Sequence, residues 1–314
     1  MFPPVLLIAY CGCIVAASLV GGMLPNMWRL SHTRLQAMMS AVGGFMLGVA
    51  VLHLLPHGIV AARQPLDWSL GWMLGGIVAM FFLIRVFHVH QHAIVEAEEH
   101  HEDQHHAAAE TALPMLAAAH ACEHDPHHQH HHDPATDVQH LGFSWVGLGL
   151  GLSLHTLIDG LALGAAVATG VPESVAVFLA VVLHKPLDAL AITTTMTAGG
   201  WNSQQRGLAN LGFSLMCPLG AALFYFGAEQ LGPRQQLVVG TALSFSAGVF
   251  LCVSLADILP ELSFHSHDRF TLSAALLLGV ASAYAIGLLE PLHSHGVQPT
   301  PEPNRGVVLP NLKK

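Results

Sequence analysis

The feature that most constrains this chain is a series of eight apolar segments, each close to the length that crosses a lipid bilayer. Only 10% of the 314 residues are charged, whereas a typical soluble domain has about a quarter. In hydrocarbon a segment must satisfy its own backbone hydrogen bonds, and a helix does so. The sequence therefore predicts an all-α integral membrane protein with eight transmembrane helices, near residues 4–24, 35–56, 69–90, 143–169, 173–198, 207–228, 236–260 and 271–291.

A segment of different composition separates the third and fourth apolar segments. Residues 88–140 contain 15 of the 24 histidines, together with acidic and alanine-rich stretches. Such a segment buries too little apolar surface to offset the entropy lost on ordering. We therefore predict four regions: transmembrane helices 1–3 in residues 1–90, a disordered His-rich cytoplasmic loop in 91–140, transmembrane helices 4–8 in 141–292, and a short polar tail in 293–314.

A short internal repeat relates the second and seventh apolar segments. The sequence from Gly44 to His57 aligns without gaps to that from Gly248 to Glu261. An even-numbered and an odd-numbered helix cross the membrane in opposite directions, so the repeat is inverted and predicts a 3+2+3 arrangement. Inverted repeats with a site near the midplane are typical of transporters. Chance similarity between two apolar helices is the alternative.

Charge gives the expected orientation and limits the partners. Arg29, Arg34, Arg206 and Arg269 lie in loops on one side, which the positive-inside rule assigns to the cytoplasm together with the His-rich loop. The net charge is −9, and nucleic-acid binding requires a clustered basic face, so no nucleic-acid partner is expected. We expect the protein to reside in the cytoplasmic membrane of a cell, with the lipid bilayer as its surroundings.

Two His-x-x-x-Asp pairs occur in consecutive apolar segments. His155 and Asp159 lie in the fourth segment, and His184 and Asp188 in the fifth. Helical residues four apart share a face, so two facing helices would offer two imidazoles and two carboxylates to one centre. This donor set suits zinc and would also accept iron(II), cobalt or manganese. The alternative is a pair of His–Asp hydrogen bonds joining helices, but ionisable groups at membrane depth are usually functional.

Pro186 lies within the fifth segment, between the histidine and the aspartate. A proline inside a helix removes a backbone hydrogen bond and frees the carbonyl group near residue 182. Broken helices often build ion sites in transporters, so Pro186 is predicted to line the site. A purely structural kink is the alternative and is compatible with that role.

The segment from His155 to Gly164, and the segment from His184 to Asp188, resemble the paired signatures of the ZIP (ZRT/IRT-like protein) family of metal transporters. The eight spans, the inverted repeat and the His-rich loop are also similar to that family. The resemblance implies uptake of zinc, iron or manganese toward the cytoplasm, with His155, Asp159, His184 and Asp188 matching the principal metal ligands. The metal is then the transported ion, no prosthetic group is expected, and a homodimer remains open.

Two residues depart from the family pattern. Thr156 stands where the family often has asparagine, and Lys185 stands where many members have a carboxylate that supports a second metal. An ammonium next to a dication is repulsive. We therefore predict that Lys185 replaces the second ion and that the site is mononuclear, lined by Thr156, Lys185 and Pro186.

Further polar residues lie at equivalent positions of the internal repeat. These are His53 and His57 in the second segment, and Asp257 and Glu261 in the seventh. One interpretation makes them stepping stones on the ion pathway. The other is that they mark helix ends at the membrane interface.

Two other functional classes fit parts of the pattern. A cation-diffusion-facilitator exporter also uses His/Asp pairs, but such proteins usually have six spans rather than eight. An intramembrane zinc hydrolase would use the metal to activate water, but the His-Glu-x-x-His signature is absent. We therefore expect a transporter that works by alternating access, and not an enzyme.

Overall fold

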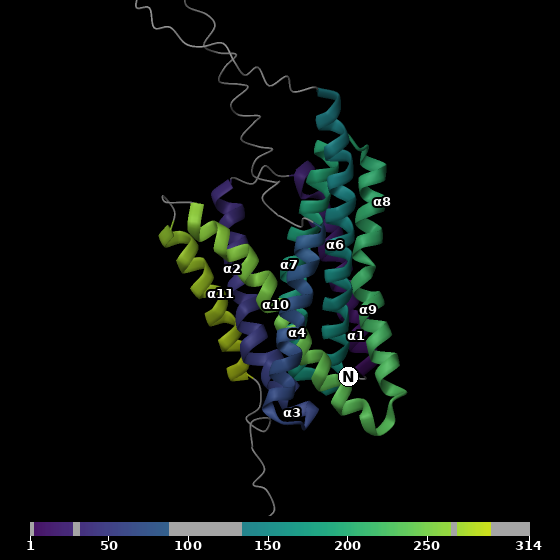
Figure 1. The fold of residues 1–314 in the computed structure, drawn as a ribbon, viewed down its shortest axis with the longest axis vertical. Helices are drawn as coiled ribbons and strands as arrows, with labels where there is room; N and C mark the ends of the chain where they lie inside the picture. Colours follow the sequence, from purple (N-terminus) through teal and green to yellow (C-terminus); the bar gives the residue numbers. More distant parts are fainter. Residues whose placement is uncertain (1–2, 28–31, 88–133, 265–268, 290–314) are drawn as a thin grey trace, which may run out of the picture.

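The structure, a computed structural model, describes residues 3–27, 32–87, 134–264 and 269–289 (Figure 1). Over these ranges the chain forms helices and the short connections between them. The elements are α1 (Pro3–Met27), α2 (His32–Val49), the π-helical turn η1 (Ala50–Leu54), α3 (Leu55–Ala62), α4 (Leu66–Phe87), α6 (Pro134–Thr169), α7 (Val171–Ala198), α8 (Ser203–Ser214), α9 (Met216–Glu229), the 3-10 turn η2 (Gly232–Arg234), α10 (Gln235–Phe264) and α11 (Arg269–Leu289).

Eight stretches of the described residues are long and apolar enough to cross a membrane. Each overlaps one of the eight predicted segments, so the predicted all-α membrane fold is confirmed. The second span, Thr33–Ala62, joins α2, η1 and α3, and the sixth, Ser203–Glu229, joins α8 and α9. The 3+2+3 inverted arrangement remains a prediction. Most of the predicted His-rich loop lies outside the described residues, and its last residues, 134–140, belong to α6.

Three prolines lie within the spans, two of them next to a departure from regular α-helix and one inside a continuous helix. Pro56 is the second residue of α3, which follows the π-helical turn η1, and Pro218 lies in the first turn of α9, just after the break at Leu215. Proline lacks the N–H group that would bond to the carbonyl one turn earlier, so the helix must adjust there. Pro186 lies inside α7, which nevertheless continues from Val171 to Ala198.

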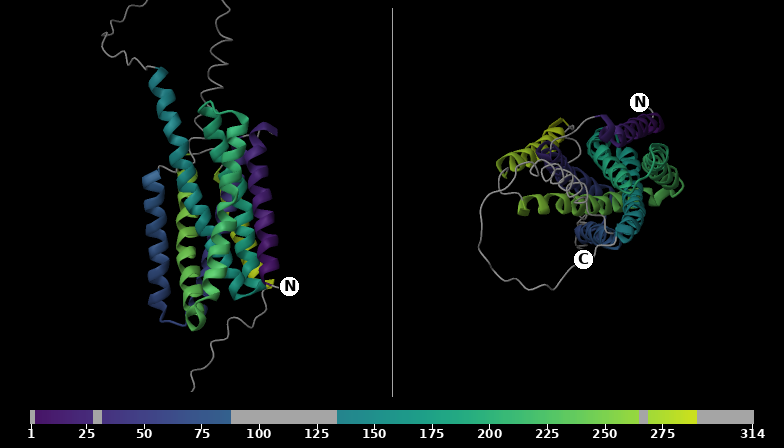
Figure 2. Two further views of the ribbon diagram at one scale, coloured as in Figure 1. Left: turned by 90° about the vertical axis from the view of Figure 1, so that its right-hand side faces the viewer. Right: turned by 90° about the horizontal axis from the view of Figure 1, so that it is seen from above.

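The helices divide into two groups by their packing. The first helix group consists of α1, α6, α7, α8 and α9, and the second of α2, η1, α3, α4, α10 and α11. Seen along the long axis, α2, α10 and α11 lie on one side and α1, α7 and α8 on the other (Figure 2). The groups meet chiefly where α10 packs on α6 and where α2 packs on α7.

Glycines allow the backbones within each group to touch. A Cβ atom added to Gly220 on α9 would lie 2.1 Å from the carbonyl oxygen of Leu157 on α6. In the second group, a Cβ at Gly248 on α10 would lie 1.9 Å from the carbonyl oxygen of Met73 on α4. Small residues permit this close approach between membrane helices, where packing rather than water exclusion drives association.

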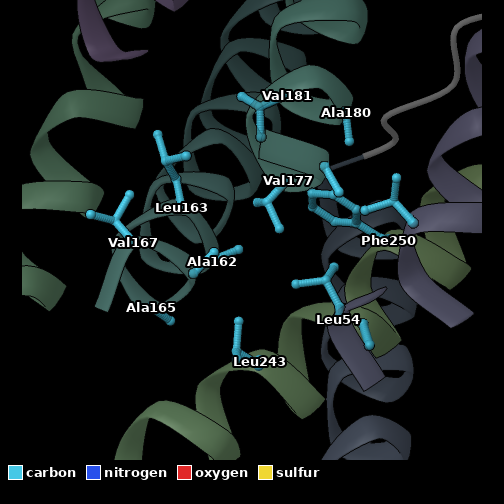
Figure 3. Close-up of a cluster of buried hydrophobic side chains, with 14 of the residues drawn as sticks. Leu54, Ala162, Leu163, Ala165, Val167, Val177, Ala180, Val181, Leu243 and Phe250 are labelled. Atoms are coloured by element: carbon cyan, nitrogen blue, oxygen red, sulfur yellow. The ribbon is translucent and has the colours of Figure 1, made fainter. Parts of the chain in front are cut away.

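A large cluster of buried apolar side chains lies where α6, α7, α10 and the second span meet (Figure 3). Leu163, Val177 and Phe250 come from the first three of these helices, and Leu54 comes from η1. All four side chains are buried. Large apolar side chains such as Leu277, on the outer face of α11, are exposed, as expected for a surface that faces lipid.

Candidate metal centre

The four predicted ligand residues come together inside the first helix group. His155 and Asp159 lie on α6, and His184 and Asp188 lie on α7, which packs against α6. One nitrogen or oxygen atom from each residue lies within 4.8 Å of the corresponding atoms of the other three. None of the four residues is more than 4% exposed. The spacing that suggested two converging faces therefore yields one buried cluster.

Asp159 is the residue through which the two helices are joined. Its Oδ2 atom lies 3.5 Å from Nε2 of His155 on its own helix and 3.2 Å from Nε2 of His184 on α7. Nε2 of His184 lies 3.8 Å from Oδ2 of Asp188. The carboxylate of Asp159 thus lies near both histidines, but only its contact with His184 is within hydrogen-bond range.

A backbone hydrogen bond fixes the orientation of His184. Its Nδ1 atom lies 2.7 Å from the carbonyl oxygen of Ala180, and a carbonyl can only accept, so Nδ1 carries the proton. In the neutral ring, Nε2 then presents a lone pair to the cluster. Metal-binding histidines commonly use their second nitrogen in this way, because the bond fixes both the tautomer and the ring.

Several polar atoms of the cluster, and the hydroxyl of Thr156 next to His155 in the sequence, have no hydrogen-bond partner among the described residues. They are Nδ1 and Nε2 of His155, Oγ1 of Thr156 and Oδ1 of Asp159. Leaving a buried donor or acceptor unsatisfied costs about 1–3 kcal/mol, so such atoms usually indicate a missing ligand. The donor set fits a divalent cation, which would accept lone pairs from imidazole nitrogen and carboxylate oxygen.

Lys185 lies within the cluster rather than beside it. Its Nζ atom is 2.6 Å from Oδ2 of Asp159, 2.7 Å from Oδ2 of Asp188 and 3.0 Å from Nε2 of His184. The three contacts use the three donors of an ammonium group. The side chain is buried, so this charge is balanced by the two carboxylates and not by water.

Sequence reasoning missed two features next to the cluster. The ring of Phe213 on α8 is buried, and its centroid is 5.8 Å from Nζ of Lys185. A cavity of about 10 Å³, lined by Met39, Met46 and Val253, reaches His184 and Asp188 from the second helix group. This volume holds about one water molecule. Apolar residues in apolar helices carry no sequence signal that would have identified either feature.

Pro186 lies where the backbone of α7 closely approaches Gly21 of α1. A Cβ atom added to Gly21 would be 2.3 Å from Cα of Pro186 and 2.4 Å from its carbonyl oxygen. The proline ring also removes the hydrogen bond that would reach the carbonyl of Val182. The backbone of α7 is therefore held against α1 at the same level as the cluster.

The predicted pathway residues His53 and His57 lie in the second helix group and are not members of the four-residue cluster. His53 on η1 donates from Nε2 to the carbonyl oxygen of Ala283 at 3.0 Å, and His57 on α3 donates from Nδ1 to the carbonyl oxygen of His53 at 2.7 Å. Both rings are buried in the second helix group. Asp257 and Glu261 lie on α10, and their side chains are outside the part of the chain that the structure describes.

A helical membrane protein with buried histidines and carboxylates clustered between two spans has the features of a divalent-cation carrier. The family model described as "ZIP Zinc transporter" matches residues 5–287. The chain therefore belongs to the ZIP zinc transporter family, and it is a membrane transporter rather than an enzyme. This assignment also excludes the intramembrane hydrolase and the cation-diffusion-facilitator exporter.

Named relatives agree with the family match. The chain is 27% identical over 286 residues to "Zinc transporter ZIP9-B" of Xenopus laevis, covering 87% of this chain and 91% of that protein. It is 34% identical over 125 residues to "Zinc transporter ZIP9" of Micropogonias undulatus, covering 38% and 40%. It is 31% identical over 130 residues to "Zinc transporter ZIP1" of Homo sapiens, covering 41% and 40%.

Proposed function

We propose that this protein carries zinc toward the cytoplasm through the cluster of His155, Asp159, His184 and Asp188. The observation that carries the proposal is the convergence of these four donors within 4.8 Å at a buried position between two spans. The unpartnered ring nitrogens of His155 support it, because a buried imidazole with no hydrogen bond is poorly explained by structure alone.

The donor set also determines which ion we expect. Two imidazole nitrogens and two carboxylate oxygens suit the tetrahedral coordination of zinc, and two carboxylates match the charge of a dication. Thr156 would contribute only a neutral hydroxyl at the edge of the site. Iron(II) and manganese(II) are related ions that the same donors would accept. The order of preference among the three ions can be measured by how strongly each of the other two inhibits zinc uptake.

The mechanism we propose is alternating access by relative movement of the two helix groups. All four proposed ligands belong to the first group, whereas the cavity that reaches His184 and Asp188 is lined by Met39 and Val253 of the second. Movement between the groups would change which side of the membrane reaches the ion. The ligand set would stay intact, because α6 and α7 move together.

We propose that the site holds one metal ion. The ammonium of Lys185 contacts both aspartates, so a second adjacent cation would meet a positive charge already in place. We expect one metal ion at the helical site in purified protein with the native Lys185, measured after deletion of residues 95–138 to remove most of the loop histidines. The Lys185→Glu variant is expected to hold up to two. Two adjacent ions in wild type would contradict this proposal.

The outlying polar residues and the location complete the proposal. His53, His57, Asp257 and Glu261 belong to the second helix group and would hand the ion to and from the central site. The His-rich loop, residues 91–140, would bind metal on the cytoplasmic side. The host membrane would be the cytoplasmic membrane. The protein would form a homodimer, which is tested by measuring the mass of the detergent-solubilised protein.

The central experiment measures zinc influx into proteoliposomes loaded with a fluorescent zinc indicator. Wild type is expected to give saturable influx, and His184→Ala is expected to lose it. The matched control is Leu183→Ala on the same helix, because Leu183 is 46% exposed and points away from the cluster. If wild type binds zinc at the helical site but gives no influx in either orientation, the proposed transport is wrong.

A further inference from the structure

The ammonium of Lys185 occupies the position that a bound metal would need. It donates to Oδ2 of Asp159, Oδ2 of Asp188 and Nε2 of His184, which are atoms of three of the four proposed ligand residues. A zinc ion lies about 2.0–2.2 Å from such atoms and uses the same lone pairs. The ammonium and the metal therefore cannot hold these three atoms at the same time.

We propose that Lys185 is a tethered cation that fills the site whenever the metal is absent, and that each transport cycle exchanges zinc for this ammonium. The inference rests on the proposed function, because it concerns the same cluster. It assigns Lys185 a positioning role in the return of the empty carrier, in addition to its effect on metal stoichiometry.

The charges of the cluster explain why an empty carrier needs such a group. Without a cation, the carboxylates of Asp159 and Asp188 would face each other in a buried site with ligand atoms no more than 4.8 Å apart. Like charges at that separation repel strongly where water is excluded. With the ammonium in place, the negative charges of both carboxylates are balanced and Nε2 of His184 has a donor, so the helices can pack closely with no metal bound.

Phe213 provides a place for the displaced ammonium. Its ring centroid is already 5.8 Å from Nζ, within the distance at which a cation is attracted to an aromatic face. The four-carbon stem of lysine is flexible enough to move Nζ by a few ångströms without moving the backbone. Zinc would therefore bind against a nearby positive charge, which weakens binding and favours release.

The flux experiment compares two modes of zinc movement in the same proteoliposomes. Net uptake into zinc-free vesicles requires the empty site to return, whereas exchange of labelled external zinc for unlabelled internal zinc does not. In Lys185→Met, net uptake is expected to fall on the order of tenfold or more while exchange stays within a few-fold of wild type. Lys185→Arg keeps a cation and is expected to retain part of the net uptake. Leu183→Met is the matched control.

The binding experiment measures zinc affinity of purified protein lacking residues 95–138 and does not depend on transport. Lys185→Met is expected to bind zinc on the order of tenfold more tightly, because a competitor has been removed. Phe213→Leu is expected to bind zinc more weakly when Lys185 is present. It should have little effect in the Lys185→Met background, since the two residues act on one ammonium.

The outcomes separate this inference from the proposed function. Equal loss of net uptake and exchange in monodisperse Lys185→Met, with unchanged or weaker zinc binding, would overturn the tethered-cation role and leave zinc transport standing. Tighter zinc binding in Lys185→Met, together with a wild type that moves no zinc, would support the competition and refute transport. Additive effects of the Phe213 and Lys185 substitutions would overturn the part assigned to Phe213.

Discussion

The crossing of α6 and α9 at Gly160 and Gly220 gives the sharpest prediction about how packing supports the metal centre. Gly220 faces the backbone of α6 at Leu157, one residue after Thr156 and two before Asp159. We expect Gly220→Ala to destabilise the protein and to weaken zinc binding together. The matched control is Gly227→Ala on the same helix, because a Cβ at Gly227 meets nothing within 4 Å.

The size of the effect follows from the contact. The new Cβ would lie 2.1 Å from the carbonyl oxygen of Leu157, whereas ordinary contacts begin at 3.4 Å. The helices must therefore separate locally by about 1 Å, and overpacking of this kind costs about 1–3 kcal/mol. The contact between Asp159 and Lys185 is 2.6 Å, so a shift of α6 relative to α7 by a similar amount, in either direction, would take this contact outside hydrogen-bond geometry.

The assay is thermal unfolding in detergent with and without zinc, followed by zinc binding at equilibrium. Each kcal/mol should lower Tm by about 2–4 °C, while Gly227→Ala should be neutral or slightly stabilising through helix propensity. A Gly220→Ala protein with the Tm and zinc affinity of Gly227→Ala would show that the α6–α9 contact does not position Asp159.

Four further predictions follow from the site. Asp188→Asn should weaken zinc binding by more than about 100-fold, measured by competition with a zinc chelator. Loss of a residue that only supports a ligand weakens metal binding by about 10–100-fold, so a larger effect would identify Asp188 as a direct ligand. Thr156→Asn adds an amide oxygen and should tighten zinc binding in the same assay. Deletion of residues 95–138 should leave net zinc uptake in proteoliposomes intact, and lost uptake with normal membrane insertion would contradict a helical transport site. Pro186→Ala restores a backbone hydrogen bond and should raise Tm while slowing uptake, and an unchanged uptake rate would mean that the proline is purely structural.

The clustering of the four candidate ligand residues could be predicted because helix geometry is local. His155 and Asp159 are four residues apart, as are His184 and Asp188, so each pair must share a helix face. The length of each apolar segment predicts a transmembrane helix, and transmembrane helices that follow one another in the sequence commonly pack together. Nothing beyond spacing and hydropathy was needed to expect the cluster.

Helix geometry alone does not place the Lys185 ammonium, and the prediction that Lys185 lines the site came instead from the comparison with the family pattern. Neighbouring residues on a helix point about 100° apart, so position 185 alone suggests a side chain directed away from the face of His184. The long flexible stem allows Nζ to return to that face, where two carboxylates attract it. Only the combined positions of α6 and α7 decide this. For the same reason Phe213, an apolar residue in an apolar span, gave no signal.

The distribution of close backbone contacts supports movement between the two helix groups. In the first group, the backbone of α9 contacts α6 at Gly220, and the backbone of α1 contacts α7 at Gly21. In the second group, α10 contacts α4 at Gly248, and α11 contacts α2 at Gly279. Each of these contacts joins helices of one group. The boundary instead carries an apolar groove of about 510 Å³, lined by residues of α4, α6, α9 and α10. Interlocked backbones resist sliding, whereas side chains along a groove can repack and lipid can fill the space. If the two groups move as proposed, the close backbone contacts would keep the candidate ligands together while the side chains at the boundary repack.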